Sequence, residues 1–174
     1  LVVAIMSEPE VTEYKGQCAC GSVRFSYAHS KEAEPVFSVI CHCLNCRRVN
    51  GSSPHLFGIP KDAFSITQGE DVMKTYDITD KFQRSFCSKC GVGVMQAPAG
   101  RGFVATFPTL FDEARQKFPK DVPDMFQVKG QVNCENAWSS VFIGSKNVAP
   151  RYRVFGTDPH EELIEDENPK HSML

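Results

Sequence analysis

The sequence predicts an all-β fold with little helix, and three observations support this prediction. Short stretches in which apolar and polar residues alternate run through most of the 174 residues, as expected of strands with one buried face. Proline, glycine and aspartate separate these stretches, as they do at turns. Only residues 109–115 carry the start signals of a helix longer than one turn. Many short strands with little helix are typical of an all-β domain.

The expected strands follow one another along a single domain, which we place over residues 11–156. In residues 22–27, Val23, Phe25 and Tyr27 alternate with polar neighbours, which is the period of a half-buried strand. The strand-like stretches are residues 11–14, 22–27, 35–40, 56–60, 63–66, 72–78, 82–86, 92–95, 103–107, 126–132 and 151–155. Residues 157–174 are polar and acidic, so we expect them to form a solvated tail.

Helix signals are few. Thr109 is a suitable N-cap for a helix over residues 109–115, and Asp112 and Glu113 would lie in its first turn, where acidic side chains are favoured. A single helical turn is also expected over residues 47–50, ended by Gly51.

The overall charge is nearly balanced, so it does not favour a function that requires a strongly charged protein surface. The chain has 19 basic and 21 acidic residues, so nothing in this balance calls for nucleic acid as a partner. No apolar stretch approaches the roughly 18 residues of a membrane span. The apolar residues 1–6 have no basic leader and make a poor signal peptide.

Seven of the eight cysteines stand in clusters. The clusters are Cys18/Cys20, Cys41/Cys43/Cys46 and Cys87/Cys90, and Cys134 stands alone. Disulfide-stapled domains are usually shorter and secreted, and cysteines one residue apart are poorly placed to bridge each other. Clustered thiols without a secretion signal therefore favour zinc and a reducing, cytoplasmic compartment over disulfides. Glycines beside the first and last clusters, Gly21 and Gly91, suit tight turns around a metal.

The number of ligands predicts two different zinc sites. A closed structural zinc takes four ligands, whereas a catalytic zinc has three protein ligands and an open position. Pairing the first cluster with the last gives four cysteines, and the central cluster then remains as a set of three. The alternative is that Cys134 completes the central site, which would make both zinc ions structural.

An open three-cysteine zinc suits a substrate thiol. Three thiolates on Zn²⁺ leave a net charge of −1, so the metal is a weak generator of hydroxide but still accepts a soft donor. The chemistry that fits best is the formation or cleavage of a carbon–sulfur bond. The alternatives are a zinc-bound water for hydrolysis or hydration, and a binding module without catalysis in which both zinc ions are structural.

The residues within and after the central cluster are candidates for supporting roles. His42 stands between two ligands, so we expect it to point away from their metal, in a structural or a proton-transfer role. Arg47 and Arg48 could offset the thiolate charge, hold a substrate carboxylate or remain solvated. His55 could line the site or be an ordinary, partly buried histidine.

Three ordered motifs resemble a known family. They read Gly16-x-Cys18-x-Cys20-Gly21-x-Val23-x-Phe25, Cys41-His42-Cys43-x-x-Cys46-Arg47 and Arg84-x-Phe86-Cys87-x-x-Cys90-Gly91. This pattern is similar to that of the glutathione-dependent formaldehyde-activating enzymes, a family that includes centromere protein V. The resemblance implies a β-tent of small antiparallel sheets stapled by zinc knuckles.

The resemblance also implies a chemistry and its ligands. It implies carbon–sulfur lyase activity, of the type in which glutathione adds to formaldehyde to give S-hydroxymethylglutathione. The implied structural zinc is held by Cys18, Cys20, Cys87 and Cys90, and the implied catalytic zinc by Cys41, Cys43 and Cys46.

Overall fold

A computed structural model of the chain describes residues 10–115 and 121–137. The strands are β1 (Thr12–Gln17), β2 (Arg24–His29), β3 (Phe37–Cys41), β4 (His55–Pro60), β5 (Phe64–Gln68), β6 (Met73–Thr79), β7 (Phe82–Cys87), β8 (Gly93–Pro98), β9 (Phe103–Thr106) and β10 (Gly130–Val132). The helical segments are α1 (Leu44–Asn50), η1 (Lys61–Ala63), η2 (Glu70–Val72), η3 (Pro108–Leu110), α2 (Asp112–Arg115), η5 (Asp124–Phe126) and η6 (Cys134–Asn136). The all-β prediction is therefore confirmed.

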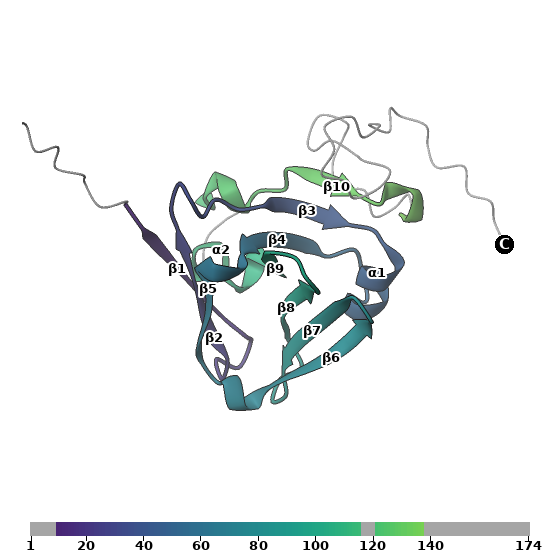
Figure 1. The fold of residues 1–174 in the computed structure, drawn as a ribbon, viewed down its shortest axis with the longest axis horizontal. Helices are drawn as coiled ribbons and strands as arrows, with labels where there is room; N and C mark the ends of the chain where they lie inside the picture. Colours follow the sequence, from purple (N-terminus) through teal and green to yellow (C-terminus); the bar gives the residue numbers. More distant parts are fainter. Residues whose placement is uncertain (1–9, 116–120, 138–174) are drawn as a thin grey trace, which may run out of the picture.

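The strands form two sheets that lean together like the sides of a tent. One sheet has three strands in the order β1-β2-β5, and the other has seven in the order β10-β3-β4-β9-β8-β7-β6. Figure 1 shows the small sheet on the left, β3, β4 and β10 along the top, and β6, β7 and β8 at the lower right. All pairings are antiparallel except that of β10 with β3, which is parallel.

Aromatic side chains fill the space between the sheets. Phe57, from the large sheet, is fully buried against Phe126, with ring centroids 4.9 Å apart. Phe111 lies 5.2 Å from Phe25 and 4.9 Å from Phe126. Edge-to-face and tilted contacts of this kind add to the stabilisation that comes from burying the rings. The core thus joins the small sheet to the large one and fixes their relative position.

The predicted helix over residues 109–115 is wrong in its boundaries. Thr109 lies inside η3 and caps no helix through its side chain, and Phe111 interrupts the helical path with an extended backbone at φ −75° and ψ 144°. Phe111 is fully buried and forms an isolated bridge to Gly16. Burial of a large ring in the core outweighs the local capping signal, so α2 begins only at Asp112.

The other strands expected within the described residues are present, with shifts at their ends. The strand expected over residues 126–132 is shorter than predicted. Residue 126 belongs to η5, which covers residues 124–126, and β10 comprises only residues 130–132. The helical turn before Gly51 is longer than expected, since α1 begins at Leu44. The expected strand at residues 151–155, the domain limit at residue 156 and the acidic tail lie outside the described residues.

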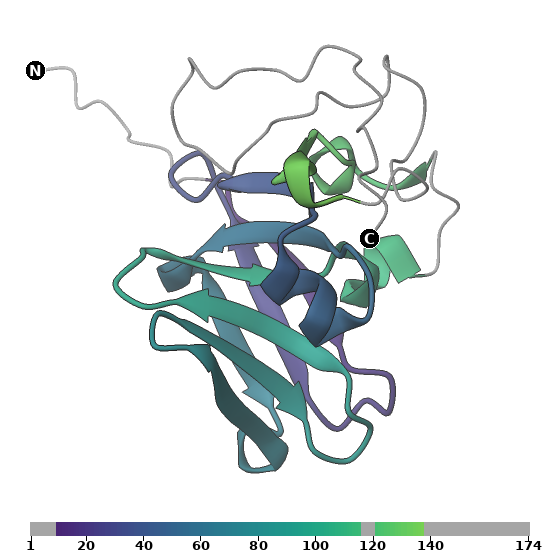
Figure 2. The same ribbon diagram turned by 90° about the vertical axis from the view of Figure 1, so that its right-hand side faces the viewer.

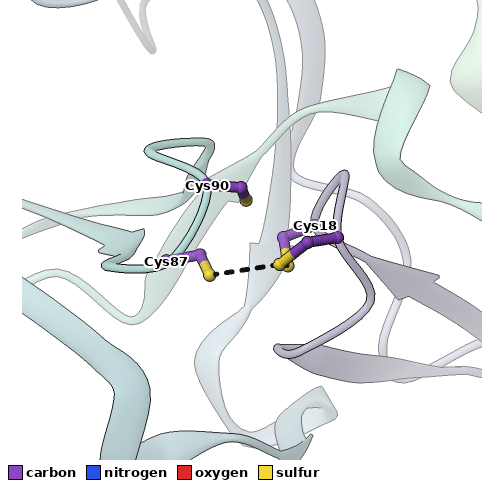
Figure 3. A group of neighbouring side chains, drawn as sticks. Cys18, Cys87 and Cys90 are labelled. Carbon is purple, nitrogen blue, oxygen red and sulfur yellow. Dashed lines mark hydrogen bonds between the residues drawn. The ribbon is translucent and has the colours of Figure 1, made fainter.

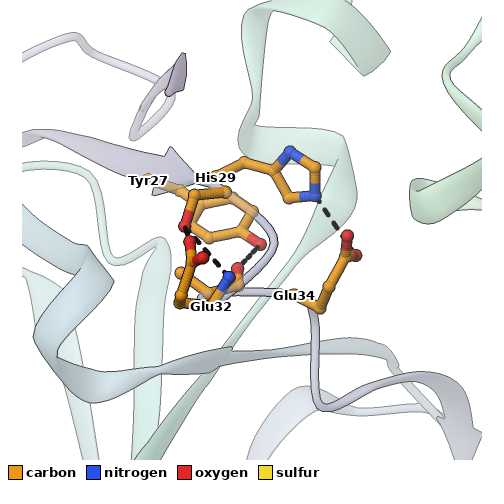
Figure 4. A network of polar contacts seen from close by, with 6 residues as sticks. Tyr27, His29, Glu32 and Glu34 are labelled. Atoms are coloured by element: carbon orange, nitrogen blue, oxygen red, sulfur yellow. Dashed lines mark hydrogen bonds and ion pairs between the residues drawn. The ribbon is translucent and has the colours of Figure 1, made fainter. Parts of the chain in front are cut away.

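A polar network orders the loop that leads from β2 to β3. The Tyr27 hydroxyl donates a hydrogen bond to the carbonyl oxygen of Ala33, and the Ser30 hydroxyl accepts one from the backbone of Glu32. At the end of β2, His29 Nε2 lies 3.2 Å from a carboxylate oxygen of Glu34 (Figure 4). These contacts satisfy polar groups locally and so define how the chain enters β3, the strand that ends at the central cysteine cluster.

Membrane insertion through a helix finds no support in this part of the chain. None of the helices in the described residues has both the length and the apolar character required to span a bilayer.

Candidate metal centres

The first and last cysteine clusters come together into one group of four sulfurs. The Sγ atoms of Cys18, Cys20, Cys87 and Cys90 all lie within 4.8 Å of one another. Cys20 Sγ is 3.6 Å from Cys18 Sγ and 3.8 Å from Cys87 Sγ. Four sulfurs about 2.3 Å from a tetrahedral zinc are roughly 3.8 Å apart, so the spacing of this group is close to what that ion requires. Figure 3 shows Cys87 and Cys90 on one loop, facing Cys18 on another.

Both loops of this group turn in the same way. The Gly91 amide donates to the Cys87 carbonyl oxygen at 2.8 Å, and the Gly21 amide donates to the Cys18 carbonyl oxygen at 3.0 Å. The two glycines have φ angles of +75° and +70°, a region that most other residues avoid. The sequence prediction of two glycine-dependent knuckles is confirmed.

The four-cysteine group is half inside the hydrophobic core. Cys18 and Cys87 are fully buried and belong to the main core cluster, whereas Cys20 is exposed. Burial raises the pKa of Cys87 to about 11, while hydrogen bonds from Ser22 lower the pKa of Cys20 to about 6. A buried thiol with a raised pKa becomes a thiolate only beside a cation, and this donor set is one that zinc prefers.

The central cluster forms a second group of three sulfurs. Cys41 ends β3, Cys43 is the N-cap of α1 and Cys46 lies inside that helix. Their Sγ atoms lie within 4.8 Å of one another. The Cys43 sulfur accepts a hydrogen bond from the Cys46 amide at 3.4 Å, as N-cap side chains do. Cys41 and Cys46 are buried and Cys43 is half-buried, so solvent reaches the group beside Cys43.

The electrostatics of the three-cysteine group also fit a soft cation. Hydrogen bonds from the Cys41 and Cys46 thiols lower the pKa of Cys43 to about 2. The hydrogen bond to Cys43 raises the pKa of Cys41 to about 11, and hydrogen bonds with Cys41 and Cys43 raise the pKa of Cys46. Without a cation, Cys43 is therefore favoured as a thiolate that accepts hydrogen bonds from the protonated Cys41 and Cys46. Three thiolates at this spacing need a positive charge between them.

A match to a known family model covers most of the described chain. The model of the glutathione-dependent formaldehyde-activating enzyme matches residues 13–128. The chain belongs to this family. Among solved structures, a crystal structure of a Rhodobacter sphaeroides protein is similar, with 17% sequence identity and a TM-score of 0.48, over 63% of this chain and 95% of the other.

All seven clustered cysteines lie within the part of the chain that matches the formaldehyde-activating enzyme family. Cys134 lies beyond it and does not join either sulfur group among the described residues. Its side chain is buried, and its thiol donates to the Gln131 carbonyl oxygen at 3.4 Å. The alternative in which Cys134 completes the central site therefore finds no support in the geometry.

Both ring nitrogens of His42 face residues outside the group of three sulfurs. His42 is fully buried, with Nδ1 2.9 Å from the Ser53 hydroxyl and Nε2 3.1 Å from Gln131 Oε1. Burial lowers its pKa, so the neutral ring is favoured, donating to Gln131 and accepting from Ser53. The ring therefore joins the segment that carries Cys41 and Cys43, here called the metal loop, to β10.

The remaining predicted residues lie near the three-cysteine group in different settings. Arg47 is half-buried on α1, and its charge contributes to the lowered pKa of His42. Arg48 is exposed on the same helix. His55, on β4, pairs with the Ser38 hydroxyl at 2.8 Å, and burial lowers its pKa to about 4. The contact of His55 with Ser38 on the neighbouring strand β3 agrees with the alternative that it is an ordinary, partly buried histidine.

Sequence reasoning missed two amide side chains that contact the three-cysteine group. Asn133 Nδ2 donates to Cys41 Sγ at 3.4 Å, and Cys46 Sγ lies 3.9 Å from Gln96 Oε1. Gln96 belongs to β8 and Asn133 follows β10, so each is far from the central cluster in the sequence. No local signal marks them, although Asn133 directly precedes the lone Cys134.

Proposed function

We propose that this chain is a zinc-dependent carbon–sulfur lyase. Its substrate would be the adduct of a thiol, glutathione or a related conjugate, with a small electrophile such as an aldehyde. The family description names glutathione and formaldehyde, which supports this substrate class. The observation that carries the proposal is the contrast between a group of four sulfurs and a group of three, to which no further histidine, cysteine or carboxylate among the described residues is added.

The proposed roles follow from burial and position. Cys41, Cys43 and Cys46 hold the zinc. When bound, this zinc supplies a soft Lewis acid that lowers the pKa of a substrate thiol and holds its sulfur. Cys43 is the half-buried member of the group, so the substrate sulfur approaches from its side. On α1, which follows Cys43, the exposed residues are Leu44, at 55%, Asn45 and Arg48.

We assign supporting roles to Arg47, Arg48 and His42. The Arg47 guanidinium, half-buried on α1, offsets the net negative charge of three thiolates on a divalent cation. Arg48, exposed on the same helix, is suited to hold a substrate carboxylate by two parallel hydrogen bonds. His42 keeps the metal loop in place through Ser53 and Gln131, and it moves no proton of the substrate.

The reaction needs no oxidant or reductant. In the direction of addition, the thiol sulfur forms a bond to the carbonyl carbon, and the carbonyl oxygen takes up the proton that the thiol gave up. In the reverse direction the carbon–sulfur bond breaks and the thiol regains its proton. A reducing compartment such as the cytoplasm would preserve the free thiols of the eight cysteines.

The test is Cys43→Ser, compared with Cys134→Ser as a control outside the sulfur group. Serine is a good N-cap, so Cys43→Ser retains the hydrogen bond at the start of α1, and the protein should stay folded. We expect two zinc ions per chain in the wild type and in Cys134→Ser, and one in Cys43→Ser. The acceleration of exchange between glutathione, ¹³C-formaldehyde and their adduct over the uncatalysed rate, followed by exchange NMR, should be lost only in Cys43→Ser. Turnover that survives without the second zinc would contradict the mechanism.

A further inference from the structure

We propose that Gln96 and Asn133 are positioning residues that donate amide hydrogen bonds to the thiolates of the three-cysteine group when it holds its metal. The proposal rests on the metal-binding role proposed above for this group, but not on the reaction or its substrate. Gln96 acts on Cys46 and Asn133 acts on Cys41, so the two buried sulfurs of the group each receive a donor. Cys43 already accepts the backbone amide of Cys46.

Asn133 is held in place over Cys41 by its backbone. It has φ 55° and ψ 42°, and it is the one non-glycine residue with a positive φ in the described part of the chain. Asparagine tolerates this left-handed conformation better than most residues, and such positions cluster at functional sites. From there Nδ2 lies 3.4 Å from Cys41 Sγ.

The segment before Asn133 is fastened to the metal loop by several hydrogen bonds. Val132 pairs with Cys41 in the parallel register of β10 and β3, and its carbonyl oxygen accepts the His42 amide at 3.0 Å. The Gln131 side chain holds the His42 ring on the other side. This segment lies beyond residue 128, where the family match ends, so the donor to Cys41 comes from outside the matched part of the chain.

Gln96 reaches the group from the opposite part of the large sheet. Its side chain is 1% exposed, and Oε1 lies 3.9 Å from Cys46 Sγ. Its Nε2 has no hydrogen-bond partner among the described residues, although a buried amide nitrogen costs free energy when it is left unpaired. A half-turn of the amide brings Nε2 to the position of Oε1, where it faces the sulfur.

Ligation of Cys46 to a metal decides which orientation of Gln96 is favoured. A protonated Cys46 thiol donates to the amide oxygen, which is the arrangement observed. A thiolate has no proton to donate, so it favours the amide nitrogen as its neighbour. Metal binding therefore satisfies Nε2 and stabilises the thiolate at the same time. Asn133 needs no such turn, because its nitrogen already faces Cys41.

The two donors affect how strongly the group holds its metal. Three thiolates on a divalent cation leave a net charge of −1, and hydrogen bonds to the sulfurs spread this charge toward the protein. Hydrogen-bond partners of metal ligands typically contribute about 10- to 100-fold in metal affinity. We expect each of these two neutral amides to lie near the lower limit, at about 10-fold.

The experiment compares Gln96→Met and Asn133→Gly with Gln83→Met. Methionine retains most of the glutamine volume without a donor, and glycine adopts the left-handed backbone of Asn133. Gln83 is exposed on β7, the strand next to Gln96, and bonds only to Asp77 among the contacts described. With the four-cysteine group filled first, zinc affinity of the second site is measured by competition with a chromophoric chelator. Cobalt substitution then reports the sulfur-to-metal charge-transfer band.

The inference expects a loss of about 10-fold in affinity at the second site in each amide variant. The charge-transfer band should move to lower energy, because a thiolate without its hydrogen bond is a stronger electron donor. Gln83→Met should match the wild type. Wild-type affinity and an unchanged band in Gln96→Met and Asn133→Gly would overturn the inference, while two zinc ions per chain would leave the proposed function intact.

Two other results are also decisive. A wild-type chain that binds a single zinc would overturn both the proposed function and this inference. Should Gln96→Met lose its fold by circular dichroism, Asn133→Gly still decides, because its change is confined to the residue that precedes the short 3-10 turn at residues 134–136.

Discussion

The position of α1, which carries Cys46, depends on a side chain from β7. Arg84 Nη1 donates to the carbonyl oxygen of Val49 in the last turn of α1. The helix has seven residues, too few to be stable on its own in water. A positive charge at the end of a helix also offsets the partial negative charge of its carbonyl groups. We therefore expect Arg84→Met to destabilise the zinc-loaded protein by about 2 kcal/mol, the usual contribution of a hydrogen bond from a charged group.

Gly93 provides an independent test of the same contact. A Cβ atom added at Gly93 would lie 2.5 Å from Arg84 Nη2 and 2.9 Å from Nε, so Gly93→Ala must push the guanidinium away from Val49. Gly93→Ala alone should therefore cost about 2 kcal/mol. In the Arg84→Met background, it should cost close to nothing, because the obstructing group is no longer there. The two changes should be strongly non-additive.

The assay is urea unfolding of the zinc-loaded wild type, the two single variants and the double variant. The coupling energy of this cycle should be about 2 kcal/mol. Hydrogen exchange in α1 should be faster in both single variants. Additive effects would refute the reasoning, because they would show that Gly93→Ala acts through something other than Arg84. A neutral Arg84→Met would show that the bond to Val49 does not stabilise the fold.

Three further predictions rest on burial. Gly16→Ala should lower the free energy of unfolding in urea by about 1–3 kcal/mol, because its Cβ would lie 2.4 Å from the Phe25 ring. The control Gly102→Ala should be neutral, because its Cβ would meet nothing within 4 Å. Cys87→Ser should lose one zinc per chain and about 4 kcal/mol or more of stability in thermal unfolding, since Cys87 is part of the main core; a stable variant with two zinc ions would contradict this. His55 has a pKa of about 4 in the fold and of about 6.5 when unfolded. The unfolded chain thus binds more protons between these values, and stability is lost as pH falls from about 6.5 toward 4. His55→Gln should reduce this slope by up to about 1.4 kcal/mol per pH unit in urea unfolding, and an unchanged slope would show that His55 does not contribute.

Most strands could be predicted because their signal is local. Alternation of apolar and polar residues places β2 and β7 within one or two residues of their observed bounds. The pairing of β10 with β3 could not be predicted in this way, because three residues of β10 carry no period. The predicted helix at residues 109–115 was wrong because Phe111 has a place in the aromatic core, and local capping signals do not report such long-range contacts.

The grouping of the cysteines is predictable for a different reason. Cysteines two or three residues apart can reach one metal ion through local turns alone, so the spacing of Cys41, Cys43 and Cys46 predicts their group without knowledge of the fold. The contacts of Gln96 and Asn133 depend on the relative position of β8 and β10, which are separated in sheet order by β3, β4 and β9. Nothing in the residues around them distinguishes these two amides from other asparagines and glutamines in the sequence.

The two sulfur groups depend on the fold in unequal ways. Cys18 and Cys87 belong to the larger core cluster, together with Phe25 and Phe57, so the four-cysteine group is part of what joins the sheets. The three-cysteine group belongs to a separate, smaller cluster with Val39, Leu56 and Ala105. Arg84 lies three residues before Cys87 on β7 and holds the helix of the second group. The first group therefore fixes the strand that positions the second, whereas no comparable contact makes the first depend on the second among the described residues. This asymmetry is consistent with the proposed division, in which one metal would maintain the fold and the other would exchange a ligand with a substrate.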